Sequence, residues 1–152
     1  MTANPIVLAL VCLLLMTAVA VTLAERQPAT QKVAHGGLPK PQVQGGMSLT
    51  EAIAKRRSVR QFTGQALTAE QVAQLCWAGQ GISDVSRQRR TAPSAGATYP
   101  LRLYVALPEG LFVYTPATHV LEPVSGEDLR GRIAEVADQK WIARAGAVFV
   151  IA

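Results

Sequence analysis

Cysteine is scarce in this chain of 152 residues, and its two cysteines lie far apart. Cys12 lies in an apolar N-terminal run, where the preceding Val11 does not suit a lipoprotein cleavage site. Cys76 is then the only thiol of the body, so a disulfide within the body is excluded. Neither an oxidising nor a reducing compartment is excluded by this. We expect Cys76 to be a small core residue on a helix.

Aromatic residues are also few, at 5% of the chain, and the Lys and Arg residues that give a net charge of +5 form no long basic run. A nucleic-acid-binding surface needs such clustered charge, so we predict that the chain does not bind nucleic acid. Paired carboxylates, a Ser-His-Asp set and a metal-binding cluster are missing too. His35, without Cys or acidic neighbours, does not indicate a metal site.

One long uncharged run is present, from residue 6 to residue 24. Small residues suit signal-peptidase cleavage after Ala20 or Ala24, and the run is also close to the roughly 20 residues that span a bilayer. No Lys or Arg precedes it, so the usual positive region of a signal peptide is missing. We predict a signal peptide or membrane anchor at 1–24, although a buried core helix is the alternative. The body would be extracytoplasmic (periplasmic or secreted) or anchored by 6–24, on a side that stays open.

Residues 25–46 are rich in Gln, Pro, Gly and Lys and lack periodicity, which predicts a linker. A short amphipathic helix follows, because Ser48 and Glu51 form a capping box. Its apolar face is predicted to turn to the core and to end in a cation; it consists of Leu49, Ala52, Ile53 and Arg56. A buried guanidinium is costly unless it is paired, so Arg56 should bind an anion.

Arg57, Ser58 and Arg60 add two cations and a hydroxyl group within the next turn and a half. Together with Arg56 they are suited to hold a phosphate, because guanidinium groups form charge-assisted hydrogen bonds with phosphate oxygens. The alternative is a helix C-terminus that carries cations to complement its dipole.

A second capping box, Thr68 with Gln71, predicts a helix with an inward stripe of Val72, Leu75 and Cys76 that stops at the glycines of 79–81. Residues 80–100 then form a long connection without regular period, which favours a functional loop. In it, three arginines precede a stretch of small residues whose backbone could lie against a flat ligand, namely Arg87, Arg89 and Arg90 ahead of Pro93, Ser94, Ala95 and Gly96. The alternative is a tight turn that leads into a strand.

The remaining chain alternates strand and turn signals. Residues 101–107 predict a half-buried strand, which should form a hairpin with 111–114, and 120–122 should follow after a turn that contains His119. We interpret His119 as a turn residue and not as a catalyst. A third helix should be capped by 125–128 and face inward through Leu129, Ile133 and Val136. The apolar run 146–152 predicts a strand covered on both faces.

Several of these motifs together resemble the FMN-dependent nitroreductase family. In order, they are Arg56-Arg57-Ser58-Val59-Arg60-Gln61-Phe62, Leu75-Cys76-Trp77-Ala78-Gly79-Gln80-Gly81, Arg90-Thr91-Ala92-Pro93-Ser94-Ala95-Gly96-Ala97-Thr98-Tyr99-Pro100-Leu101, the strand that follows, and Gly110-Leu111-Phe112-Val113-Tyr114 with His119-Val120-Leu121-Glu122. The resemblance runs from about Ser48 to Ala152. It is closest to the SagB-type branch, which includes dehydrogenases that oxidise azolines in modified peptides.

The resemblance implies an α+β fold, with a mixed or antiparallel sheet flanked by helices, and an obligate homodimer with FMN at the interface. It implies that Arg56, Arg57, Ser58 and Arg60 hold the FMN phosphate, ribityl chain and ring edge. Pro93, Ser94, Ala95 and Gly96 would cover the flavin of the partner chain. Hydride would pass through the flavin N5 between NAD(P)H or an organic substrate and an acceptor, and the substrate would be a small molecule or a peptide. Ala97, where many nitroreductases have Asn, favours the SagB-type branch.

The family's pattern continues beyond Ala152, so we expect 47–152 to be the N-terminal part of a domain that is incomplete at its C-terminus. We therefore expect weak FMN binding and negligible NAD(P)H oxidation by this chain. The alternative function is a catalytically inactive remnant that acts at most as a membrane-tethered binding module.

Overall fold

The computed structural model describes residues 36–152. The predicted signal peptide or anchor at 1–24 and the first half of the predicted linker, 25–35, lie outside this range. Among the described residues, no helix combines the length and the apolar character that crossing a membrane requires.

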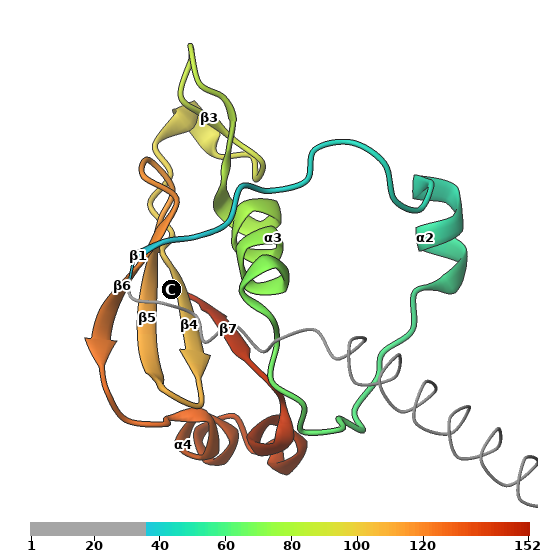
Figure 1. Ribbon diagram of the computed structural model, residues 1–152, viewed down its shortest axis with the longest axis vertical. Helices are drawn as coiled ribbons and strands as arrows, with labels where there is room; N and C mark the ends of the chain where they lie inside the picture. Colours follow the sequence, from blue (N-terminus) through green and yellow to red (C-terminus); the bar gives the residue numbers. More distant parts are fainter. Residues whose placement is uncertain (1–35) are drawn as a thin grey trace, which may run out of the picture.

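The body is built on a five-stranded antiparallel sheet with the strand order β1-β6-β5-β4-β7 (Figure 1). The strands are β1 (Gly36–Gly37), β4 (Leu103–Leu107), β5 (Gly110–Thr115), β6 (Val120–Ser125) and β7 (Val148–Ile151). The predicted hairpin is confirmed, since Tyr104 pairs with Val113 and Leu107 with Gly110. Within the predicted linker, β1 pairs with β6 and brings residues 36–37 into the sheet.

Helix α3 (Ala69–Gln80) packs on one face of this sheet, as its sequence predicts. The Thr68 side chain accepts from the Gln71 backbone N–H and the Gln71 side chain accepts from the Thr68 N–H, so the capping box is confirmed. Val72 and Cys76 are fully buried against strand residues such as Phe112. Each fully buried aliphatic side chain of this size stabilises the fold by about 1.5–3 kcal/mol. Leu75, predicted to face inward, is 47% exposed because it lies at the border of the buried stripe.

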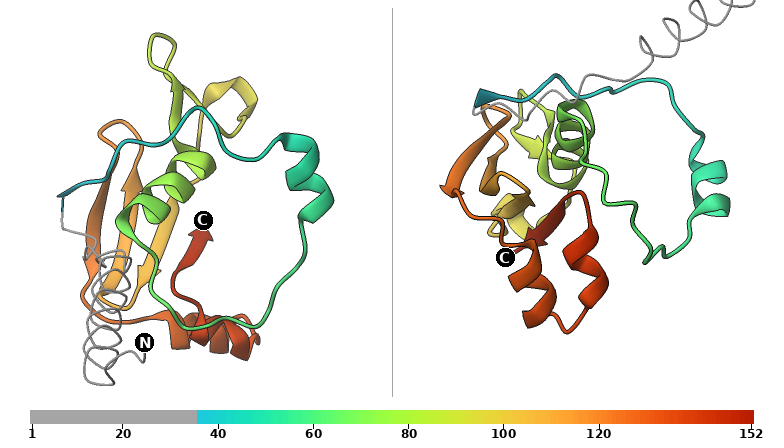
Figure 2. Two further views of the ribbon diagram at one scale, coloured as in Figure 1. Left: turned by 45° about the vertical axis from the view of Figure 1, so that its right-hand side comes forward. Right: turned by 60° about the horizontal axis from the view of Figure 1, so that its bottom comes forward.

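Helix α2 (Leu49–Lys55) forms where predicted, and the Ser48 hydroxyl accepts from the Glu51 N–H. Its predicted packing is wrong: Leu49 is 76% exposed and Ile53 is 66% exposed. Both views of Figure 2 show α2 standing apart from the sheet and from α3. A helix of two turns is only marginally stable without tertiary packing, and irregular segments on both sides join α2 to the rest of the fold. Arg56 is therefore exposed and not buried at the end of a core stripe.

The connection between α3 and β4 is more regular than its sequence indicates. Strands β2 (Ile82–Asp84) and β3 (Arg89–Arg90) form a projecting hairpin, and a short 3-10 helix η1 (Ala95–Ala97) follows. The Asp84 carboxylate closes the hairpin turn by accepting from the Ser86 hydroxyl and the Arg87 N–H. Both hydrogen bonds lower the pKa of Asp84, and the bond from the Ser86 hydroxyl has the larger effect. Because β2 and β3 are so short, the sequence of this hairpin shows no alternation of apolar and polar residues from which the strands could be predicted.

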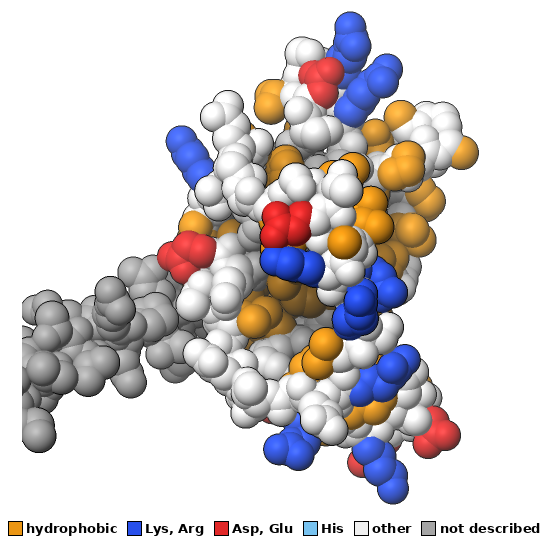
Figure 3. All heavy atoms as spheres, turned by 90° about the vertical axis from the view of Figure 1, so that its right-hand side faces the viewer, with side chains coloured by type: hydrophobic (Ala, Val, Ile, Leu, Met, Phe, Trp, Pro, Cys, Tyr) orange, Lys and Arg blue, Asp and Glu red, His pale blue; other side chains and the backbone are white. Residues whose placement is uncertain are grey.

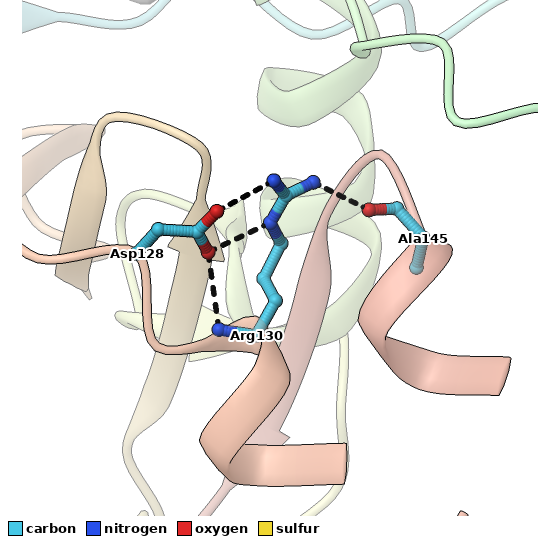
Figure 4. Close-up of polar contacts among 3 residues, drawn as sticks. All are labelled: Asp128, Arg130 and Ala145. Carbon is cyan, nitrogen blue, oxygen red and sulfur yellow. Dashed lines mark hydrogen bonds and ion pairs between the residues drawn. The ribbon is translucent and has the colours of Figure 1, made fainter. Parts of the chain in front are cut away.

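Helix α4 (Arg130–Val136) begins later than predicted; its N-cap residue Leu129 provides no side-chain cap, but the Asp128 carboxylate accepts from the Arg130 backbone N–H at 3.1 Å. Val136, predicted to face inward, is 85% exposed. The Asp128 carboxylate also binds the guanidinium group of Arg130 through two hydrogen bonds of 2.7 and 2.9 Å (Figure 4). Arg130 also donates to the Ala145 carbonyl at 2.7 Å, and so joins the start of α4 to the segment between the 3-10 helix η2 (Lys140–Arg144) and β7.

The predicted strand near residue 152 is confirmed as β7, but its expected coverage on both faces is wrong. Strand β7 lies at an edge of the sheet, where it pairs with β4. Val148, Phe149 and Val150 are half-buried and Ile151 is 59% exposed. Helix α3 covers only one face, so the continuous apolar run indicates more burial than the described residues supply.

Candidate cofactor and ligand site

The four predicted phosphate-binding residues follow directly on α2 and are all exposed. Arg56 leaves the helix with φ −54° and ψ 126°. The Arg57 guanidinium donates to the carbonyl oxygens of Ala54 and Arg56, at 3.0 and 2.7 Å, which is the capping alternative raised by the sequence. Within the described residues, Arg56 and Arg60 form no ion pair, so both keep their charge available for an anion.

Arg60 lies beside a basic cavity that the sequence did not predict. Its guanidinium carbon is 5.9 Å from the centre of the Trp141 ring, and the Phe62 ring packs on the same Trp141 at 5.7 Å. The cavity measures about 520 Å³, and its lining includes no carboxylate: Arg60, Gln61, Phe62, Lys140, Trp141 and Arg144. Figure 3 shows Lys and Arg side chains gathered on this side of the molecule, below α2. Three cations around an aromatic pair favour a planar or phosphorylated anion.

The second predicted group, Pro93 to Gly96, lies in the turn that contains η1. The Ser94 hydroxyl accepts from the Tyr99 N–H at 2.9 Å, which fixes the turn. Gly96 has φ 61°, a left-handed conformation that favours glycine. Ala95 and Gly96 are exposed, whereas Pro93 and Ser94 line a cavity of about 230 Å³ together with Gln80, Tyr99, Pro100 and Leu101. The turn thus offers small side chains and accessible backbone.

The structure does not bring the two predicted groups together. The residues after α2 and the turn at η1 lie on separate parts of the molecule (Figure 1) and line different cavities. Within one chain they therefore cannot contact the same small ligand. Such a separation is compatible with the prediction that the two groups come from different chains.

A third cavity, which the sequence did not predict, adjoins the η1 turn and contains Arg90. It measures about 430 Å³. The Arg90 guanidinium carbon lies 4.7 Å from the centre of the Tyr99 ring, and its Nη1 donates to Oε1 of Gln80 at 3.1 Å. The Arg90 backbone N–H donates to the Tyr99 hydroxyl at 3.2 Å. No local pattern in the sequence distinguishes Arg90 from Arg87 and Arg89, which are both exposed.

Two groups whose pKa values are raised, Cys76 and Tyr114, belong to the hydrophobic core. Burial raises the pKa of the Cys76 thiol to about 12, which excludes a thiolate nucleophile and agrees with the predicted core role. Burial, with a smaller effect of Cys76, raises the pKa of Tyr114 to about 12. His119 lies in the turn between β5 and β6 with φ 53°, which confirms it as a turn residue. The described residues contain no group of His, Cys, Asp and Glu that could hold a metal ion.

Comparison with known proteins shows which family the chain is similar to. The nitroreductase family pattern matches residues 53–152. A protein of Methanocaldococcus jannaschii named as a candidate nitroreductase is 35% identical over 113 residues, or 70% of this chain. The crystal structure of a candidate nitroreductase from Ralstonia eutropha superposes with a TM-score of 0.62 at 37% identity over 68% of this chain.

A candidate nitroreductase from Anabaena variabilis, at 20% identity and a TM-score of 0.57, supports the fold alone; it covers 82% of this chain and 27% of its own. The predicted α+β nitroreductase fold is thereby confirmed. The chain spans 57% of the length of the M. jannaschii relative and 50% of that of the R. eutropha chain.

Proposed function

Because the chain belongs to the nitroreductase family, we propose that it acts as an FMN-dependent oxidoreductase of the SagB-type branch. When bound, FMN would carry hydride through its N5 between NAD(P)H or an organic substrate and an acceptor. The residues of this chain would bind and orient the cofactor.

Arg56, Ser58 and Arg60 are the proposed ligands of the FMN phosphate and ring edge, with Arg57 beside them. The observation that carries this assignment is that Arg56 and Arg60 form no ion pair within the described residues, and that Arg60 lines a cavity with two further cations and no carboxylate. Guanidinium groups that are already ion-paired would have to break a bond to bind phosphate, whereas these two do not. Trp141 and Phe62 add an apolar surface of the kind on which a planar ring can pack.

The turn from Pro93 to Gly96 would cover the flavin held by the partner chain of a homodimer. Two observations support this arrangement. The turn is separated from the Arg56–Arg60 segment within one chain. The exposed apolar side chains of Leu49, Ile53 and Val59 lie on and just after α2, and an exposed apolar surface favours association.

The substrate would be a small molecule or a peptide. Ala97, at the position where many nitroreductases carry Asn, supports the SagB-type branch over reduction of nitroaromatic compounds. The proposed location of the body, extracytoplasmic or anchored to a membrane by residues 6–24, rests on the sequence of the N-terminal run alone.

Purification of the full chain with excess FMN, followed by gel filtration, tests the proposal. Flavin absorbance that elutes with a dimer and NADH oxidation above that of free FMN would support the enzyme, and would overturn the expectation of weak FMN binding and negligible NAD(P)H oxidation. A colourless protein that takes up no FMN on reconstitution would contradict it, and would favour the inactive binding module that the sequence leaves as the alternative.

A further inference from the structure

Arg90 is held from three directions before any ligand arrives. Its guanidinium group stacks on the Tyr99 ring at 4.7 Å and donates to Gln80 at 3.1 Å, while its backbone N–H bonds the Tyr99 hydroxyl. Gln80 is 7% exposed, which makes it the buried polar side chain in the core of the described residues. An arginine fixed in this way loses little side-chain freedom when it binds a ligand.

The charge of Arg90 is nevertheless not neutralised. Within the described residues the ion pairs join Lys55 to Glu51 and Arg130 to Asp128, so Arg90 has the neutral amide of Gln80 as its partner. Glu122 also lines the cavity, where its carboxylate accepts from the Thr115 hydroxyl at 2.6 Å, but the two cations Arg90 and Arg102 outnumber it. A guanidinium group has five N–H donors, and the Gln80 oxygen takes one of them.

The cavity around Arg90 suits a small organic molecule. Its volume of about 430 Å³ falls in the range of ligand pockets, roughly 300–1,000 Å³. The larger part of its lining surface is polar, and its apolar part is formed by aliphatic and proline side chains, among them Pro100, Leu101 and Pro116. A second cation, Arg102, lies in the same wall. The cavity therefore combines a fixed planar cation with a largely polar lining and a smaller apolar surface.

We propose that Arg90 binds the carboxylate group of a small molecule whose apolar part packs on Pro100 and Leu101. The fork of a guanidinium group matches a carboxylate in a bidentate geometry, and an apolar wall binds the rest of the molecule. That this molecule is the substrate rests on the proposed oxidoreductase function, because the cavity adjoins the Pro93–Ser94 turn. Binding itself does not rest on that function.

The test uses the full chain without FMN and titrates benzoate against its neutral analogue benzamide. The ¹⁵N–H resonance of the Arg90 side chain reports binding directly. We expect saturable binding of benzoate with a shift of this resonance, and benzamide binding at least about tenfold weaker, since a charge-assisted hydrogen bond contributes that much. Equal affinity for the two compounds, or no saturable binding of benzoate, would overturn the proposal.

Variants identify the residue. Arg90→Gln should weaken benzoate binding about 10-fold to 100-fold, whereas Arg87→Gln, with the same loss of charge on the same hairpin, should leave it unchanged. Gln80→Glu should weaken binding as well, because a carboxylate next to Arg90 neutralises its charge while the shape is kept. Equal losses in Arg87→Gln and Arg90→Gln would show a general charge effect and overturn the assignment. None of these titrations uses flavin. FMN binding can therefore fail while benzoate binding is observed, and benzoate binding can fail while FMN binds.

Discussion

The hydroxyl group of Tyr114 lies 2.8 Å from Nδ1 of His119, and the two rings meet edge to face. On its other side, Nε2 of His119 lies 2.9 Å from the carbonyl oxygen of Pro39. A neutral imidazole satisfies both contacts, because Nε2–H donates to Pro39 while Nδ1 accepts from Tyr114. His119 thus fastens the segment after β1 to the turn between β5 and β6.

Replacement of His119 by Asn should therefore loosen this segment. Asn tolerates the positive φ of the position but loses the contact that spans from Tyr114 to Pro39. We expect a loss of about 1–2 kcal/mol in the free energy of unfolding, measured in urea, and faster amide exchange in residues 36–41. Thr118→Ala, in the same turn, is the control. Unchanged exchange in His119→Asn would contradict the fastening role.

Cys76 should be chemically inert in the folded protein. Its pKa of about 12 leaves almost no thiolate at pH 8, and its side chain is fully buried. In a Cys12→Ser variant, a thiol reagent such as DTNB should react only after denaturant is added. Rapid reaction of the folded variant would show that the helix α3 core opens far more readily than its packing indicates.

The pairing of Asp128 with Arg130 should make stability depend on pH on the acid side. The Arg130 hydrogen bond lowers the pKa of Asp128, so this contribution is present above the unfolded pKa and is lost as the pH falls through the folded pKa. Because the Asp128 side chain is 41% exposed, we expect Asp128→Asn to cost only about 0.5–1 kcal/mol at pH 7. The difference from wild type should vanish at strongly acid pH, as followed by urea unfolding. A cost that persists there, or an equal cost in Glu127→Gln, would contradict the ion-pair explanation.

The sequence predicts those parts of the fold that local signals determine. The Thr68 capping box places the start of α3, and alternation from Leu103 to Leu107 with the turn at Gly110 places the central hairpin. The burial of α2 could not be predicted in the same way, because its apolar stripe indicates which face is buried but not which surface covers it. Leu49, which the stripe predicts to be buried, is therefore exposed in the structure.

The residues of the candidate site differ in the same way, because only some of them belong to a local sequence pattern. The run from Arg56 to Arg60 is a local cluster of charge and is visible in the sequence, whereas Lys140 and Arg144 join Arg60 only through folding. Arg90 stands out from its neighbours by its contacts with Gln80 and Tyr99, ten and nine residues away, and no local pattern encodes them.

The binding of FMN through Arg56 is the central claim, and a titration tests it most directly. FMN fluorescence should be quenched by the full wild-type chain, and Arg56→Ala should lose about 1.5–3 kcal/mol of binding free energy, the range for hydrogen bonds to a charged group. Arg132→Ala, which removes the same charge from an exposed position on α4, should bind FMN like the wild type. Equal FMN affinity in wild type and Arg56→Ala, or an equal loss in Arg132→Ala, would contradict the assignment.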